Sequence, residues 1–336
     1  MALSLRLPTL TSQQEDIAMR AKQVSGAGSA PRANGFAIYM KRYWVLYAML
    51  ALPLIYFSLF KYVPFQYIQI AFKDYKIGIS PWEMPWADNN GMRYFIQAFS
   101  NRDFIYALRN TVMLNGLDLL IGFPAPIILA IILNELRFRK FKRFTQTVAY
   151  MPHFLSWIII SGLARQVLAP STGLVNIWLT NMGLDTMHFL DRPANWVWTY
   201  VFLGIWQSVG WNSIIYLAAI SGINPELYEA AEVDGAGRIR KIINITLPGL
   251  RPTIVVLLVL SLGRMLGSEF DRPFALTNNL VKSVSNVIAT FVYTNGIRGL
   301  QISLTTAVGL FQSVINVIFL TFANVLAKRM GERGVW

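Results

Sequence analysis

Four polar residues recur at helical spacing in the C-terminal third of this 336-residue chain. They are Ser261, Arg264, Ser268 and Asp271. A spacing of three and four positions places side chains on one face of an α-helix. Arg264 follows Pro252, the expected start of an apolar helix, by 12 residues, which is roughly 18 Å along the helix axis. A guanidinium at that depth needs a partner, so we expect Arg264 to bind the carboxylate of Asp118, of Glu269 or of a ligand.

Three further apolar segments carry polar residues at the same spacing. These are Asn115, Asp118 and Gly122; Ser208, Asn212 and Tyr216; and Thr305, Gly309, Gln312 and Asn316. Such residues commonly join helices in a membrane, but four stripes, one with a full charge, favour a hydrated path. Trp206, Trp211 and Tyr216 could also stack on sugar rings, although interfacial packing explains Trp206 equally well. The predicted path residues are Asn212, Tyr216, Trp211, Arg264, Ser268, Glu269, Asp271, Gln312 and Asn316.

Residues that could support catalysis are sparse. The acid pairs, Glu83 with Asp88 and Glu269 with Asp271, lack the matched environments that glycosidic chemistry requires. No G-x-x-x-x-G-K-[ST] nucleotide-binding loop occurs. The chain has two histidines, in different regions, and no cysteine, so we expect no metal site. The sequence therefore predicts a protein that is not an enzyme by itself and carries no cofactor.

The composition indicates an integral membrane protein. Hydrophobic residues make up 54% of the chain and charged residues only 14%, and the mean hydropathy is +0.44. A soluble domain of this length usually has about a quarter of its residues charged. The formal net charge is +13, but the basic residues cluster beside apolar runs, as on cytoplasmic membrane flanks. We therefore expect lipid, and not nucleic acid, around this chain.

Six apolar stretches are long enough to cross a bilayer of about 30 Å, which takes about 20 helical residues. They are Tyr43–Phe72, Thr111–Asn134, Thr145–Leu168, Trp196–Ile220, Pro252–Phe270 and Leu304–Ala327. The polar residues 1–40 contain no apolar core of a signal peptide. We predict an all-α membrane protein with an N-terminal segment (1–40) and a transmembrane domain (41–336).

Basic residues indicate the orientation of these helices. Lysine and arginine concentrate before the first stretch, in "ELRFRKFKRF" after the second, in the loop after the fourth, and in the C-terminal tail. With six crossings, all four regions lie on one side, and basic loops lie in the cytoplasm. Both termini and the loop after the fourth helix are therefore predicted to be cytoplasmic.

That loop contains a charged segment, "ELYEAAEVDGAGRIRKIINITLPGLRPTI", which is unusual between two apolar helices. Asn224 is the expected cap of a helix, and Pro225 is its expected first residue. Gly235 and Gly237 allow a turn, and we expect a second short helix to end at Pro248. The segment is thus predicted to be a compact helix-turn-helix on the membrane surface.

The segment has the pattern E-A-A-x3-G-x9-I-x-L-P from Glu229 to Pro248. This pattern resembles the docking loop of transmembrane subunits of ABC importers. "YMPHFLSW", "FPAPIILAIILNELR" and "GERGVW" are similar to the carbohydrate-importer branch that serves complex or acidic oligosaccharides such as aldouronates and alginate. The resemblance covers residues from about 41 to the C-terminus and implies a type I ABC importer permease fold.

The resemblance also implies partners and roles. The loop 224–248 would dock in a cleft on a cytoplasmic ATPase dimer, which would bind ATP and magnesium, with Glu229 contacting a basic residue there and Gly235 shaping the turn. The motif positions are Glu229, Ala230, Ala231, Asp234, Gly235, Ile245, Leu247 and Pro248. A second homologous permease and a periplasmic or extracellular solute-binding protein would complete an importer in the bacterial inner membrane.

Several functions compete with import of an acidic oligosaccharide. The same architecture could carry a neutral sugar or a peptide-like substrate. An ion-driven secondary transporter is disfavoured by the docking loop and by the shortage of acids inside the predicted spans, where Asp118 is the only clear candidate. A membrane-bound glycosyltransferase would need a nucleotide-sugar carboxylate motif, which is lacking.

Overall fold

A computed structural model describes residues 34–267, 269–329, 331 and 334. The predicted N-terminal segment therefore lies largely outside the described residues, as does Ser268. Residues 34–40 of that segment are helical and open the first long helix. By internal contacts the chain divides into two units, residues 1–67 and 68–336.

The first unit consists of helix α2 (Asn34–Phe57), the π-helical turn η1 (Ser58–Tyr62) and the start of the 3₁₀ segment η2 (Val63–Phe72). The backbone is kinked at Tyr43, and Pro53 lies inside α2. The helical run Tyr39–Phe72 is 34 residues long and apolar enough to cross a membrane. This agrees with the predicted first span, which is longer than a bilayer core requires.

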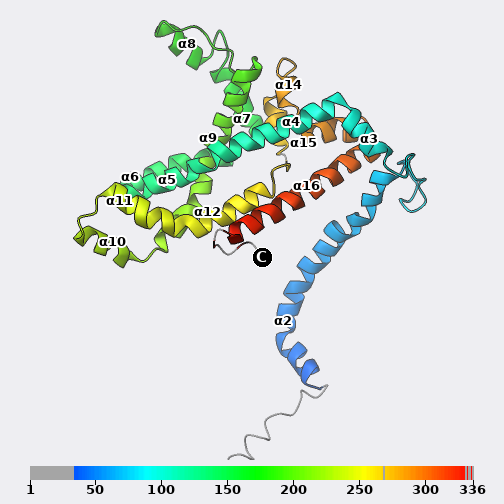
Figure 1. Cartoon of the computed structure of the whole chain (residues 1–336), viewed down its shortest axis with the longest axis horizontal. Helices are drawn as coiled ribbons and strands as arrows, with labels where there is room; N and C mark the ends of the chain where they lie inside the picture. The colour runs from blue at the N-terminus through cyan, green and yellow to red at the C-terminus, as the bar shows by residue number, and fades with distance from the viewer. Residues whose placement is uncertain (1–33, 268, 330, 332–333, 335–336) are drawn as a thin grey trace, which may run out of the picture. The chain divides into compact units, whose positions relative to one another are not determined.

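The second unit is helical throughout its regular structure (Figure 1). Its elements up to the charged segment are α3 (Arg93–Ser100), α4 (Arg102–Leu117), η3 (Asp118–Gly122), α5 (Pro124–Glu135), α6 (Arg139–Tyr150), η4 (Met151–Phe154), α7 (Trp157–Val167), α8 (Leu174–Asn181) and α9 (Pro193–Ser221). The remaining elements are α10 (Pro225–Val233), α11 (Arg238–Lys241), η5 (Ile242–Thr246), α12 (Leu247–Leu262), α13 (Asp271–Leu276), α14 (Lys282–Ser285), α15 (Ile288–Val292), η6 (Tyr293–Arg298) and α16 (Ile302–Arg329).

The long helices account for the predicted spans. Together with Tyr39–Phe72, four further helical runs of the described chain are long and apolar enough to cross a membrane, which makes five. The total is six if the bent pair Arg139–Phe154 and Trp157–Val167 is counted as one span. The four runs are Arg102–Glu135, Pro193–Ser221, Arg238–Leu262 and Ile302–Arg329. The predicted all-α fold with several membrane-spanning helices is thereby confirmed by length and composition.

The third predicted span, Thr145–Leu168, is not one continuous helix. The chain bends by 104° between Arg139–Phe154 and Trp157–Val167. Ser156 is extended and its hydroxyl accepts from the Ile159 amide at 3.4 Å, so it caps a new helix. The apolar pattern continues through the bend, which is why hydropathy alone missed it.

The fifth predicted span, Pro252–Phe270, is wrong at both ends. The helix runs unbroken from Arg238 to Leu262, and Pro248 does not end it. Pro248 lies in the first turn of α12, after the π-helical turn η5, where a missing amide hydrogen is tolerated. The chain then leaves the helix at Gly263 and starts α13 only at Asp271.

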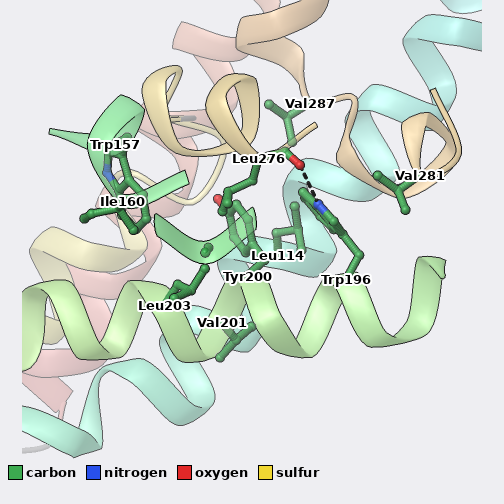
Figure 2. Close-up of a cluster of buried hydrophobic side chains, with 11 residues drawn as sticks. Leu114, Trp157, Ile160, Trp196, Tyr200, Val201, Leu203, Leu276, Val281 and Val287 are labelled. Atoms are coloured by element: carbon green, nitrogen blue, oxygen red, sulfur yellow. Dashed lines mark hydrogen bonds between the residues drawn. The ribbon is translucent and has the colours of Figure 1, made fainter. Parts of the chain in front are cut away.

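One of the buried hydrophobic clusters of the second unit gathers around α9 (Figure 2). Trp196 is fully buried, its indole N–H donates to the Leu276 carbonyl at 3.0 Å, and its ring stacks on Tyr200. Trp157 and Ile160 of α7 and Leu114 of α4 join the same cluster. This core packs α13 against the N-terminal half of α9.

Candidate functional site

A cavity of about 550 Å³ lies within the second unit. Its walls come from α4 and η3, from the start of α5, from α9, and from the end of α12 with the turn after it. The polar and charged residues that line it are Asn115, Asp118, Ser208, Asn212, Tyr216, Ser261, Arg264, Glu269 and Arg272. Polar side chains of three of the predicted stripes thus share one hollow.

An ion pair closes one side of this cavity. The Arg272 guanidinium donates to both carboxylate oxygens of Asp118, at 2.8 and 3.3 Å, and also to the Tyr200 carbonyl. It lies over the Tyr200 ring at 3.6 Å, and the Arg272 side chain is 5% exposed. Gly204 is required behind it, because a Cβ there would overlap the guanidinium. Arg272 was not predicted from the sequence, because its partners Asp118 and Tyr200 are distant in the chain and no short motif connects them.

Glu269, the other acid that lines the cavity, also has a hydrogen-bond partner. The Glu269 carboxylate accepts from the Trp157 indole N–H at 2.7 Å. The Arg264 side chain makes no hydrogen bond or ion pair with another residue in the described part of the chain, and it is exposed. Asp118 and Glu269 are therefore not the partners of Arg264 in this structure, and its exposed side chain is accessible to water or to a ligand.

The predicted single face Ser261–Arg264–Ser268–Asp271 does not exist, because α12 ends at Leu262. Arg264 instead lies in a turn held by amide side chains from two helices. Asn115 donates to the Met265 carbonyl at 2.8 Å. The Leu266 amide donates to Asn316 at 3.0 Å, and Gln312 donates to the Leu266 carbonyl. The backbone groups left unpaired where a helix ends need such partners, and the expected depth of Arg264, which was counted from Pro252, does not hold because the helix starts at Arg238.

The predicted path residues consequently separate into two groups. Asn212, Tyr216, Arg264 and Glu269 line the cavity. The lining does not include Trp211, Asp271, Gln312 and Asn316. Trp211 stacks on His153 with ring centroids 4.6 Å apart, while Gln312 and Asn316 support the turn. For these three residues the structure favours a packing role, and contact with a substrate stays a prediction.

The charged segment forms a second candidate site. α10 begins as expected, with the Asn224 side chain accepting from the Glu226 amide at 3.1 Å. Gly235 has φ +72°, a conformation that L side chains rarely adopt, so glycine is needed at this turn. Gly237 has an ordinary backbone (φ −68°) and instead caps α11. The predicted turn is therefore confirmed at Gly235 and does not depend on Gly237.

Side-chain contacts hold α10 to the long helix that follows. The Tyr228 and Thr246 hydroxyls are 3.0 Å apart, and Thr246 is buried. Lys241 forms an ion pair with Glu232 at 3.5 Å. These contacts connect α10 directly to α11 and η5, which run on into α12, so the segment is one body with that helix.

One face of the charged segment has no cover within the described chain. Val233 is 89% exposed and Leu227 52%, and Ala230 is exposed between them in sequence. The Glu229 carboxylate is exposed and makes no hydrogen bond or ion pair with a described residue. An exposed apolar face beside a free carboxylate is suited to binding another protein.

Comparison with known proteins assigns the chain to a family. Residues 122–332 match the model of the binding-protein-dependent transport system inner membrane component. The chain belongs to this family. It is a multi-pass protein of the bacterial inner membrane, and it is a transporter subunit rather than a catalyst.

Two relatives of this family member come from Bacillus subtilis (strain 168). The polygalacturonan/rhamnogalacturonan transport system permease protein YteP is 42% identical over 87% of this chain and 90% of its own length. The protein LplB is 42% identical over 88% of this chain and 92% of its own. A sugar or oligosaccharide ABC importer permease is the function that these similarities support.

Two solved structures are similar in fold. A bacterial ABC transporter involved in the import of the acidic polysaccharide alginate matches with a TM-score of 0.79 and 40% identity, over 88% of this chain and 99% of that chain. A bacterial alginate ABC transporter in complex with an alginate pentasaccharide-bound periplasmic protein matches with a TM-score of 0.80 and 41% identity. This match covers 88% of the present chain and 98% of that chain. The predicted ABC importer permease fold is confirmed, and an alginate importer is the structural neighbour that the sequence motifs favoured.

Proposed function

We propose that this permease forms, with a second homologous permease, the inward path for an acidic oligosaccharide such as alginate or an aldouronate. The observation that carries the proposal is the charge pattern of the cavity. Asp118 pairs with Arg272 and Glu269 binds Trp157, which leaves Arg264 as the lining charge without a partner among the described residues. A guanidinium that lines an open cavity can bind a carboxylate by bidentate, charge-assisted hydrogen bonds.

The power source in this proposal is a separate cytoplasmic ATPase dimer, which binds ATP and magnesium. The exposed face around Glu229 and Val233 would dock in a cleft of that dimer. A solute-binding protein outside the membrane would deliver the sugar, as the periplasmic protein carries the pentasaccharide in the complex described above. The orientation with cytoplasmic termini belongs to the same proposal and rests on the distribution of basic residues.

Substitution of the free cation tests the substrate class. Arg264→Gln should impair uptake of an acidic oligosaccharide by about 4- to 12-fold more than uptake of a neutral one of equal length, since a charge-assisted contact contributes about 1.5–3 kcal/mol and a neutral one about half that. Uptake is measured in cells in which the variant replaces the native copy, normalised to the amount of folded protein in the membrane.

Arg298→Gln is the matched control, because Arg298 is exposed and does not line the cavity. It should leave both uptakes unchanged. Equal impairment of the acidic and neutral sugars by Arg264→Gln would refute the acidic substrate and favour a neutral one carried by the same architecture.

A separate experiment tests the docking role. Glu229→Ala and Gly235→Pro should reduce both co-purification of the ATPase and substrate-stimulated ATP hydrolysis in reconstituted complexes. Glu226→Gln is the control, because Glu226 is an exposed acid of the same helix outside the motif. Unchanged stimulation in both motif variants would refute the docking assignment without affecting the conclusion about the cavity.

A further inference from the structure

A second cavity, of about 440 Å³, lies beside the charged segment. Its volume is within the range of about 300–1,000 Å³ that ligand pockets occupy. The residues that line it are Asn134, Glu135, Leu136, Arg137, Ile220, Ser221, Ile223, Pro225, Tyr228, Arg238 and Lys241. They come from the ends of α5, α9 and α11 and from the start of α10.

The lining of this cavity is strongly basic. Three cations, Arg137, Arg238 and Lys241, face one carboxylate, that of Glu135. Lys241 is shared with Glu232 outside the lining. The side chains of Arg137 and Arg238 make no hydrogen bond or ion pair with a residue of the described chain, and both are exposed. Two guanidinium groups are therefore available to an anion at this cavity.

The cavity also lies at a defined place along the spans. Three of the membrane-spanning helices begin or end on its rim: Arg102–Glu135 ends at Glu135, Pro193–Ser221 ends at Ser221, and Arg238–Leu262 begins at Arg238. These helices are 34, 29 and 25 residues long, whereas a hydrocarbon core takes about 20 residues, so their charged ends at Glu135 and Arg238 lie outside it, on the headgroup side. Basic pockets between helices at this level bind anionic lipid headgroups.

Apolar surface continues from the cavity along the adjacent helix. Ile128 and Ile132 are 56% and 54% exposed and lie one turn apart on the same face of α5, and Asn134 and Glu135 at the end of that helix line the cavity. A diacyl lipid whose phosphate enters the cavity would lay its chains along such a surface, whereas a free anion would gain nothing from it.

We propose that this cavity binds the phosphate of an anionic phospholipid headgroup, held by Arg137, Arg238 and Lys241 at the edge of the membrane. The bound lipid would sit against Tyr228, the residue that joins α10 to the long helix through Thr246. The lipid composition of the membrane would thereby influence the segment to which the docking role is assigned.

The test uses the full-length protein purified in a neutral detergent. Native mass spectrometry counts bound phosphatidylglycerol and, separately, bound phosphatidylcholine as each lipid is titrated. Each basic residue near an anionic lipid contributes about 1 kcal/mol, which is about fivefold in affinity. Arg137→Gln with Arg238→Gln should therefore weaken phosphatidylglycerol binding by about 25-fold and leave phosphatidylcholine binding unchanged.

The matched control is Arg139→Gln with Lys140→Gln, which removes the same amount of charge from exposed residues outside the lining, two and three positions after Arg137. The control should lower phosphatidylglycerol binding by less than about twofold. Circular dichroism confirms that both double variants remain folded, which is expected because all four side chains are exposed.

Three outcomes would overturn the proposal. Equal losses in the cavity and control variants would mean that general surface charge, not this cavity, attracts the lipid. Displacement of phosphatidylglycerol by excess inorganic phosphate, with the same dependence on Arg137 and Arg238, would identify a free-anion site. Unchanged lipid binding with loss of the co-purifying ATPase in the cavity variant would show that these cations serve the protein partner instead.

Discussion

The ion pair between Asp118 and Arg272 at the wall of the cavity is expected to stabilise the fold, and this contribution can be measured. Asp118→Asn keeps the shape of the side chain but leaves the Arg272 guanidinium buried beside a neutral amide. Breaking a buried pair by removing one partner costs about 3–5 kcal/mol. The Asp118 side chain is 32% exposed, against 5% for Arg272, so water from the cavity already reaches the carboxylate. We therefore expect the lower end, about 3 kcal/mol of the free energy of unfolding.

The measurement is unfolding of the detergent-purified chain, followed by the fluorescence of its 10 tryptophans. Asp271→Asn is the control, because Asp271 is an exposed acid of the neighbouring helix and its loss from a helix start costs less than about 1 kcal/mol. Adding Arg272→Gln to Asp118→Asn should recover part of the loss, since the two residues act together. A loss below about 1 kcal/mol for Asp118→Asn alone would refute the structural role of the pair.

Three further changes have defined outcomes. Gly204→Ala should destabilise the protein by about 1–3 kcal/mol in the same unfolding assay, because its Cβ would overlap the guanidinium behind it; unaltered unfolding would refute this packing. Gly235→Ala should cost about 1–2 kcal/mol through its positive φ alone, since a Cβ there meets open space, and Gly237→Ala, whose backbone is ordinary, should cost less than half as much. A single cysteine introduced at Lys140 should be labelled only from the cytoplasm, and one at Asp88 only from outside. The native chain has no cysteine that could add background labelling. The opposite labelling pattern would reverse the predicted orientation.

Hydropathy was sufficient to locate the long helices, because a span needs only an apolar length and that is local information. It was insufficient wherever the chain breaks within an apolar stretch. At Ser156 and at Gly263 the apolar composition continues while the helix stops. The amide groups freed at Gly263 are satisfied by side chains of distant helices, such as Asn316, which no local pattern predicts.

The cavity lining was predicted in part for a similar reason. Helical spacing correctly grouped Asn115 with Asp118 and Asn212 with Tyr216, because each pair sits on an intact helix. The partner of Asp118 could not be predicted, since Arg272 comes from a short helix 154 residues away in sequence and is placed by the packing of Trp157 and Tyr200 around it.

The unbroken helix from Arg238 to Leu262 has a mechanical consequence. Its 25 residues span about 37 Å at about 1.5 Å per residue, with the charged segment fixed at one end through Tyr228 and Thr246. A tilt of about 5° imposed at the Arg238 end displaces Leu262 by roughly 3 Å, which is about the width of a water molecule. Leu266, only four residues later, is anchored to α16, and α16 itself packs on α12 through the buried residues Val255, Val259, Ala323 and Ala327. A movement of the charged segment is therefore transmitted through α12 to α16 and to the turn after α12, which carries Arg264.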